Sequence, residues 1–338
     1  MKDDESIVFV LGAGASKFLG YPTGKELVQN IAESFSLPDY RQEDITRFKE
    51  VLKSSYLPSI DSFLEKSSNF TNEWVDYAYL GRAAIVKEII SKEDRNKLRS
   101  FDHENWYRYI WGKIYKDYRN LLETGKISFI TFNYDLSLEY FLEEAIRNSH
   151  YGSTYTLEGR NTFWETMRKT NIIHVYGKLD LLPWENDKIN DPSGVNKQFG
   201  IFSSSREYGE NSLYPIEKLS KNISIIEDDK LPEGFQHARE MLKEASYICF
   251  LGFGYDPVNL DRLGFDEKTI YAFESKKPHS FYHKVKKIYG TAFGLKQAER
   301  DSLIKRLCPN ADKRQKRLCF GNENQGIVDF LRDKFDVL

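Results

Sequence analysis

The sequence has few cysteines and almost no net charge, and each of these features excludes classes of protein. Its three cysteines, Cys249, Cys308 and Cys319, are widely spaced, and no CxxC pair is present. A zinc ribbon and a disulfide framework are therefore excluded, and no zinc or other metal site is expected. The 49 basic and 51 acidic residues give a net charge of −2, so the chain has no bulk attraction to nucleic acid or to an anionic membrane.

The sequence also lacks internal repeats, low-complexity tracts and long apolar runs. Residues 1–5 are mostly charged and lead into an apolar segment that is too short for a signal peptide or a membrane span. We therefore expect a cytoplasmic protein that makes no contact with a membrane. A basic run at residues 313–317 is typical of a solvated loop or helix face, so no nucleic-acid partner is indicated directly.

Aromatic residues, by contrast, are plentiful. The 23 Phe and 21 Tyr residues provide enough large side chains to fill a sizeable core. Short apolar runs typical of buried strands occur at 7–11, 127–132, 172–176, 247–251 and 269–273. Helical patterns lie between them, at 23–34, 136–147, 236–244 and 325–335. This alternation predicts an α/β fold, a Rossmann-like parallel sheet with helices on both faces.

The stretch 39–124 departs from that alternation. Its apolar residues recur at near-helical spacing, and it contains no convincing strand. We predict that 39–124 forms a helical insertion subdomain, and that 1–38 plus 125–338 form one Rossmann-like domain. Our hypothesis is that the insertion covers the ligand pocket of that domain.

A glycine-rich segment at residues 12–16, Gly-Ala-Gly-Ala-Ser, follows the first predicted strand. Gly12 and Gly14 would let the backbone approach a pyrophosphate, and a following helix would offer N–H donors. Lys17 stands where the usual dinucleotide fingerprint has its third glycine. The alternative is a tight turn at the strand exit that binds no ligand.

A second group of candidate residues lies at the carboxyl end of the second predicted strand. Thr131, Asn133 and Asp135 alternate along an extended chain, so their side chains point the same way. Open α/β sheets bind ligands at the carboxyl ends of their strands. Asp135 has a simpler alternative role as the cap of the next helix.

Two further strand ends carry candidate residues. His174 and Tyr176 share a face of the third predicted strand, just before a glycine. A lone histidine in an apolar strand is more often a satisfied core residue than a catalytic one. Gly252, Gly254 and Asp256 form another glycine-rich strand exit before a predicted helix.

These segments, taken together and in this order, resemble the sirtuin (silent information regulator) superfamily. Residues 12–16 and 20–22 are similar to the family's GAGxS segment and the G-x-P loop that follows it. Residues 131–135, Thr-Phe-Asn-Tyr-Asp, are similar to the family's TQN-x-D strand end. The strands that contain His174 and precede Gly252 are similar to its catalytic-histidine and late-glycine segments. The sequence most resembles the NAD-hydrolysing sirtuin-like domains of bacterial antiphage defence systems.

The resemblance implies that NAD is a substrate, cleaved to nicotinamide and ADP-ribose, and not a redox cofactor. It implies that Asn133 holds the ribose and the attacking water, that Asp135 contacts the nicotinamide carboxamide, and that His174 is the general base. It also implies a set of NAD-binding residues, namely Gly12, Ala13, Gly14, Ser16, Pro22, Thr131, Tyr176, Gly252, Gly254 and Asp256.

The sequence departs from the family pattern in two ways. Sirtuins usually have histidine directly before the glycine, where this sequence has Tyr176, and His174 lies two residues earlier. The four-cysteine zinc module is absent, which argues against a protein deacylase and favours hydrolysis. The alternatives are a non-hydrolytic sensor of NAD or ADP-ribose, and a protein deacylase or ADP-ribosyltransferase.

The resemblance also implies control by other proteins. Sirtuin-like defence domains are commonly silent until a partner or a phage component triggers them. We therefore expect a homo-oligomer, or a complex with a HerA-type ATPase or another defence partner.

Overall fold

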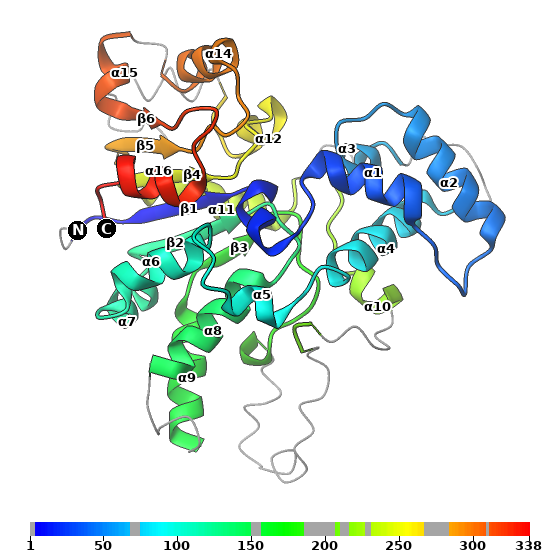
Figure 1. Cartoon of the computed structure of the whole chain (residues 1–338), viewed down its shortest axis with the longest axis horizontal. Coiled ribbons are helices and arrows are strands. Elements are labelled where there is room, and N and C mark those ends of the chain that lie inside the picture. Colours follow the sequence, from blue (N-terminus) through cyan, green and yellow to red (C-terminus); the bar gives the residue numbers. More distant parts are fainter. Residues whose placement is uncertain are drawn as a thin grey trace.

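A sheet of six parallel strands lies at the centre of the described part of the computed structural model, in the order β3-β2-β1-β4-β5-β6 (Figure 1). The strands are β1 (Ile7–Leu11), β2 (Ile127–Thr131), β3 (Ile172–His174), β4 (Tyr247–Leu251), β5 (Lys287–Gly290) and β6 (Leu318–Phe320). The structure describes residues 4–67, 75–149, 157–185, 207–209, 216–226, 231–266, 284–308 and 311–338. The predicted α/β fold with a parallel sheet is confirmed.

β1 lies in the middle of the sheet. It pairs with β2 on one side and with β4 on the other, so that Ile7 lies opposite both Ile127 and Tyr247. All five residues of β1 and all five of β2 are buried. Apolar strands of this kind are expected where helices cover both faces of a parallel sheet.

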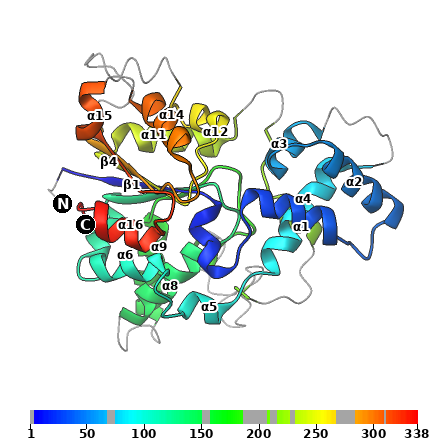
Figure 2. The same ribbon diagram turned by 45° about the horizontal axis from the view of Figure 1, so that its top comes forward.

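Helices lie between the strands in the chain and after the last strand. They are η1 (Ala13–Leu19), α1 (Gly24–Ser34), α2 (Gln42–Ser54), α3 (Ile60–Glu65), α4 (Tyr77–Ile90), α5 (Arg95–Arg99), α6 (Trp106–Ile114), α7 (Tyr118–Glu123), α8 (Ser137–Ser149), α9 (Leu157–Lys169), η3 (Pro183–Glu185), α10 (Ile216–Ser220), α11 (Glu233–Glu244), α12 (Pro257–Arg262), α14 (Gln297–Leu307), α15 (Ala311–Arg317) and α16 (Ile327–Lys334). Figure 2 shows α11, α12 and α14 on one face of the sheet and α6, α8 and α16 on the other. Among the described residues, none of these helices has both the length and the apolar character needed to cross a membrane.

The helices α1 to α4, together with α10, pack against one another as a group. This group lies beyond the carboxyl ends of the strands (Figure 1). By contrast, α6 packs against α8 and α16, and α7 packs against β2 and α9. The predicted insertion at 39–124 therefore contains helices of the group beyond the strand ends, α2 to α4, and also α6 and α7, which pack against the sheet and its covering helices. Its bounds, and those of the domain formed by 1–38 plus 125–338, stay predictions.

The predicted strands at 7–11 and 247–251 have the bounds that the sequence indicates. β2 and β3 end one and two residues earlier than predicted. β3 ends early because the chain turns after His174, and Gly177 then takes a left-handed conformation with a φ of 77°. The strand predicted at 269–273 lies outside the described residues.

The strands β5 and β6 are not predicted from the sequence. β5 reads Lys-Ile-Tyr-Gly, and β6 has three residues that directly follow the basic run. Segments with so few apolar residues give no periodic signal. The basic run itself forms most of α15, in agreement with its interpretation as a loop or helix face.

The loops that follow β1 and β4 touch through their backbones. Gly12 N–H donates to the oxygen of Leu251 at 3.0 Å, and Gly14 N–H donates to that of Gly252 at 2.9 Å. A Cβ on Gly12 would lie 2.6 Å from the Gly252 oxygen, and a Cβ on Gly252 would lie 2.1 Å from the nitrogen of Ala15. Gly252 also has a left-handed φ of 56°. No side chain therefore fits between these loops.

We expect Gly252→Ala to lower the free energy of unfolding by more than about 2 kcal/mol, because its Cβ overlaps the η1 backbone and its φ is strained. Gly254→Ala is the matched control, since nothing lies within 4 Å of a Cβ at that position. The control should change stability by less than about 1 kcal/mol. Urea unfolding followed by circular dichroism measures both values. Equal destabilisation by the two variants would contradict the proposed reason for the glycine.

Candidate functional site

The strand order marks a ligand-binding edge between β1 and β4. The chain leaves β1 to build one side of the sheet and returns with β4 to build the other, so the strand order reverses at this pair. Open α/β sheets bind ligands outside the carboxyl ends of the strands at such a switch point. The order 3-2-1-4-5-6 is also the one typical of dinucleotide-binding folds. The two glycine loops lie at this edge.

Three of the predicted site residues meet here. Ser16, on η1, donates from its hydroxyl to Asp135 Oδ2 at 2.9 Å, and Asn133 Nδ2 donates to Ser16 Oγ at 3.0 Å. Thr131 Oγ1 accepts a hydrogen bond from the backbone N–H of Asn133 at 3.0 Å, which orients the chain as it leaves β2. Ser16 and Asp135 are 119 residues apart in the sequence. The fold thus brings the glycine-rich segment and the Thr-Phe-Asn-Tyr-Asp segment into direct contact.

The Ser16 hydroxyl fixes which way the Asn133 amide faces. A serine hydroxyl has a single hydrogen, and Ser16 donates it to the Asp135 carboxylate. Ser16 Oγ can therefore only accept from Asn133, so the amide NH₂ faces Ser16 and the amide oxygen Oδ1 faces away. In the part of the chain that the structure describes, no hydrogen-bond donor contacts this oxygen. Asn133 is half-buried, so Oδ1 is an available acceptor at the edge of the sheet.

Asp135 is buried and accepts hydrogen bonds from two neighbouring segments. Its Oδ1 accepts from the backbone N–H of Ser137 at 3.1 Å and from the Ser137 hydroxyl. Because that hydroxyl has given its hydrogen to Asp135, it accepts one from Tyr107 at 2.7 Å. Burial raises the pKa of Asp135, and the hydrogen bonds from Ser137 and Ser16 oppose the rise. Asp135 therefore contacts the start of α8, as its simpler predicted role requires, and also holds Ser16.

His174 lies away from solvent, with 4% of its side chain exposed. Nδ1 lies 2.9 Å from the backbone oxygen of Asn133, and Nε2 lies 2.6 Å from Glu139 Oε1. Burial alone would raise the pKa of Glu139, but the charge and hydrogen bond of His174 outweigh it and lower that pKa, with Lys178 adding to the effect. The role of His174 as a general base stays a prediction.

Tyr176 points towards α12. Its hydroxyl donates to Asn259 Oδ1 at 2.8 Å and accepts from Arg262 Nη1 at 2.8 Å. Arg262 also forms a bidentate ion pair with Glu65 of α3, at 2.8 and 2.9 Å. The prediction that His174 and Tyr176 share a strand face is therefore wrong, because β3 ends at His174 and the chain turns before Tyr176.

The glycines of the two loops have a structural explanation. The N–H groups of Gly12, Gly14 and Ala15 donate to backbone carbonyls, so they are already occupied. The close contact between the loops requires glycine whether or not a phosphate binds nearby. The loops present half-exposed residues at the edge, namely Ala13, Gly14 and Gly252.

Three other residues implied by the resemblance lie around this core. Gly254 and Asp256 are exposed after β4, and Pro22 is buried just before α1. Asp256 accepts a hydrogen bond from the backbone N–H of Asn259 at 3.0 Å and so caps α12. The assignment of these residues to NAD binding stays a prediction.

Sequence reasoning misses three residues of this network, Tyr107, Ser137 and Glu139. Ser137 and Glu139 follow Asp135 by two and four residues, so polar residues within one helical turn of the motif are the signal that could have found them. Tyr107 lies in α6, and nothing in the sequence marks it. Its neighbour Trp106 donates from Nε1 to the backbone oxygen of Ala15 at 2.7 Å, so α6 also holds η1 in place.

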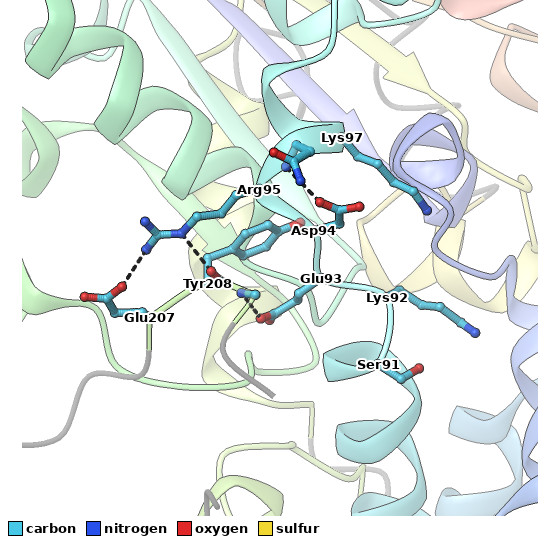
Figure 3. Close-up of a pocket in the computed structure, with 10 residues that line it drawn as sticks. Ser91, Lys92, Glu93, Asp94, Arg95, Lys97, Glu207 and Tyr208 are labelled. Atoms are coloured by element: carbon cyan, nitrogen blue, oxygen red, sulfur yellow. Dashed lines mark hydrogen bonds and ion pairs between the residues drawn. The ribbon is translucent and has the colours of Figure 1, made fainter. Parts of the chain in front are cut away.

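A hollow of about 640 Å³ opens nearby and is lined by residues 91–97 and 207–209 (Figure 3). Its volume is sufficient for a small molecule. Tyr208 lines it, and the Tyr208 hydroxyl lies 2.8 Å from that of Tyr21. Burial raises the pKa of Tyr21, and the charges of Tyr208 and Asp135 raise it further. The acidic residues that line it are bonded within the protein: Glu93 to Gly209 N–H, Asp94 to Asn96 N–H and Glu207 to Arg95.

We expect Glu139→Gln to lower the free energy of unfolding by about 3–5 kcal/mol near neutral pH, because a buried ion pair loses one of its charges. Since the pKa of Glu139 is lowered, its contribution is complete above the ordinary value of 4.5 and is lost as the pH falls through the lowered pKa. The difference from wild type should therefore shrink in acid. Urea unfolding across this pH range measures it.

Glu144→Gln is the control for this measurement. Glu144 lies on the same helix and forms a partly exposed ion pair with Arg99 at 2.7 Å. An exposed pair of this kind contributes less than about 1 kcal/mol. If the destabilisation caused by Glu139→Gln grew as the pH fell, the result would contradict the ion pair.

No protein-family model matches the chain, and no curated protein shows significant similarity to it. Its function is therefore inferred from the fold, from the contacts at the carboxyl edge of the sheet and from the resemblance of its motifs.

Proposed function

We propose that the chain is an NAD⁺ hydrolase that cleaves the nicotinamide–ribose bond and releases nicotinamide and ADP-ribose. The observation that carries this proposal is the oriented amide of Asn133, whose oxygen is an available acceptor at the switch point of the sheet. The strand order supports the binding of a dinucleotide at this edge. The resemblance of the motifs to the sirtuin superfamily supports cleavage of NAD⁺ over its use as a redox cofactor.

The chemistry of this reaction makes few demands on the protein. The leaving group is a cationic pyridinium, so the bonding electron pair departs with it and neutral nicotinamide forms without an acid. The ribose passes through an oxocarbenium-like state, as in other glycoside hydrolyses. Water then adds its oxygen to the anomeric carbon and releases one proton to solvent. The protein must position the water and stabilise the positive charge on the ribose.

Asn133 Oδ1 is suited to both tasks. It would accept a hydrogen bond from a ribose hydroxyl or from the attacking water, and its partial negative charge would stabilise the oxocarbenium-like state. Ser16 and Asp135 hold the amide in one orientation, so little reorganisation is needed as the charge develops. Removing a preorganised polar group of this kind typically reduces kcat by about 10²–10³-fold.

The biological setting of the reaction rests on the resemblance alone. NAD⁺ depletion in antiphage defence, and control through a homo-oligomer or a HerA-type ATPase, are part of the proposal. The helices α1 to α4 lie beyond the carboxyl ends of the strands, where a partner could change the access of NAD⁺ to Asn133.

A second candidate function is a sensor that binds NAD⁺ or ADP-ribose without cleaving it. The burial of His174 favours this function, because both of its ring nitrogens already have protein partners. Such a protein would bind NAD⁺, release no nicotinamide and bind equally well after His174→Ala.

Purified protein incubated with NAD⁺ should release nicotinamide and ADP-ribose in equal amounts, as measured by chromatography. We expect Asn133→Ala to reduce kcat by about 100-fold or more, because the oriented acceptor is lost. Asn148→Ala makes the same chemical change at an exposed position near the end of α8 and should keep the wild-type rate.

Calorimetric titration with NAD⁺ separates the two candidate functions. Binding by wild type without release of nicotinamide, even with defence partners added, would support the sensor. A chain that binds neither NAD⁺ nor ADP-ribose would contradict both functions.

A further inference from the structure

His174 and Glu139 form a buried pair that contacts the backbone of Asn133. Only 4% of each side chain is exposed. The imidazole bonds to Glu139 Oε1 through Nε2, at 2.6 Å, and to the Asn133 backbone oxygen through Nδ1, at 2.9 Å. β3 supplies the histidine, α8 supplies the glutamate, and the segment after β2 supplies the carbonyl. Three separate segments of the chain therefore meet at one imidazole ring.

The Asn133 backbone oxygen determines the role of one ring nitrogen. A backbone carbonyl has no hydrogen to donate, so Nδ1 is the donor in this contact. The other nitrogen, Nε2, contacts Glu139, and only 4% of the His174 side chain is exposed. Both ring nitrogens are therefore engaged by the protein, and in this arrangement neither is placed to take a proton from water as a general base would.

The second oxygen of Glu139 shows that the pair has a cost to stability. Oε2 is buried, and none of the described residues donates a hydrogen bond to it. A buried carboxylate oxygen without a donor destabilises a fold, and a well-packed apolar pair of similar size would avoid that cost. Local features that lower stability are typical of functional positions.

We propose that His174, oriented by Glu139, is a positioning residue that acts through Asn133. Nδ1–H holds the Asn133 backbone oxygen while Ser16 holds its side-chain NH₂, so Asn133 is fixed at two points with Oδ1 facing the ligand edge. This inference rests on the proposed hydrolysis of NAD⁺ and identifies the residues that prepare its acceptor. The proton released when water adds to the ribose passes to solvent, and His174 does not take it.

The test compares two double variants that share Glu139→Gln, so that neither leaves an unpaired buried charge. In His174→Asn, the amide nitrogen is as many bonds from Cα as Nδ1 and can donate to the Asn133 oxygen, but an amide is not a base. In His174→Ala, the donor is removed. Release of nicotinamide from NAD⁺ gives kcat and KM for each protein, and thermal melting confirms that each one folds.

We expect the asparagine double variant to keep kcat within about tenfold of wild type, and the alanine double variant to lose about 100-fold or more with a smaller change in KM. Equal losses of about 100-fold or more in both would identify His174 as a general base and overturn the positioning role. Full activity in both would also overturn it. A wild type that releases no nicotinamide would remove the proposed function itself.

A second measurement depends on neither catalysis nor the folding of the alanine variant. Nitrogen-15 spectra of histidine-labelled wild type, with the His174 signals assigned from their loss in the asparagine double variant, report the protonation of each ring nitrogen. We expect Nδ1 to carry a proton near neutral pH, because its partner is a backbone carbonyl. A ring whose Nδ1 carries no proton would overturn the hydrogen bond on which the positioning role depends.

Discussion

The direct contact between two backbone loops determines the geometry of the carboxyl edge of the sheet. Because Gly14 and Gly252 have no side chains, the loops after β1 and β4 approach closely enough for a hydrogen bond between their backbones. η1 therefore begins at a fixed place, and Ser16 on η1 reaches the segment that follows β2. A side chain between the loops would displace η1, and the hydrogen bonds from Asn133 through Ser16 to Asp135 would be lost.

Two buried carboxylates at the start of α8 are stabilised in different ways. Asp135 accepts from neutral hydroxyl and N–H groups, and its pKa is raised because burial outweighs these hydrogen bonds. Glu139 has the imidazole of His174 as its partner, and its pKa is lowered because the interaction with His174 outweighs burial. The charge of Glu139 is among the causes that raise the pKa of Asp135. The charged pair and the hydroxyl network therefore lie close enough to influence each other, and both hold Asn133.

The sequence predicts those features that depend on short segments. β1 and β4 are uninterrupted apolar runs, so their bounds are correct, and the meeting of Ser16 with Asn133 follows from the shared carboxyl edge of parallel strands. The contact of Tyr107 with this network depends on how α6 packs, which no local pattern encodes. His174 contacts α8 and Tyr176 contacts α12, and this difference depends on a turn that appears in the sequence only as a glycine.

The central position of β1 has a consequence for folding. Ile7 pairs with Ile127 and with Tyr247, so the first strand of the chain acquires its neighbours only after about 120 and 240 further residues. At ordinary rates of protein synthesis, its second neighbour emerges roughly 10–50 s after it. Such a high contact order predicts slow folding. Until β2 emerges, five consecutive apolar residues have no native partner strand, and unpaired apolar segments of this kind are prone to aggregation.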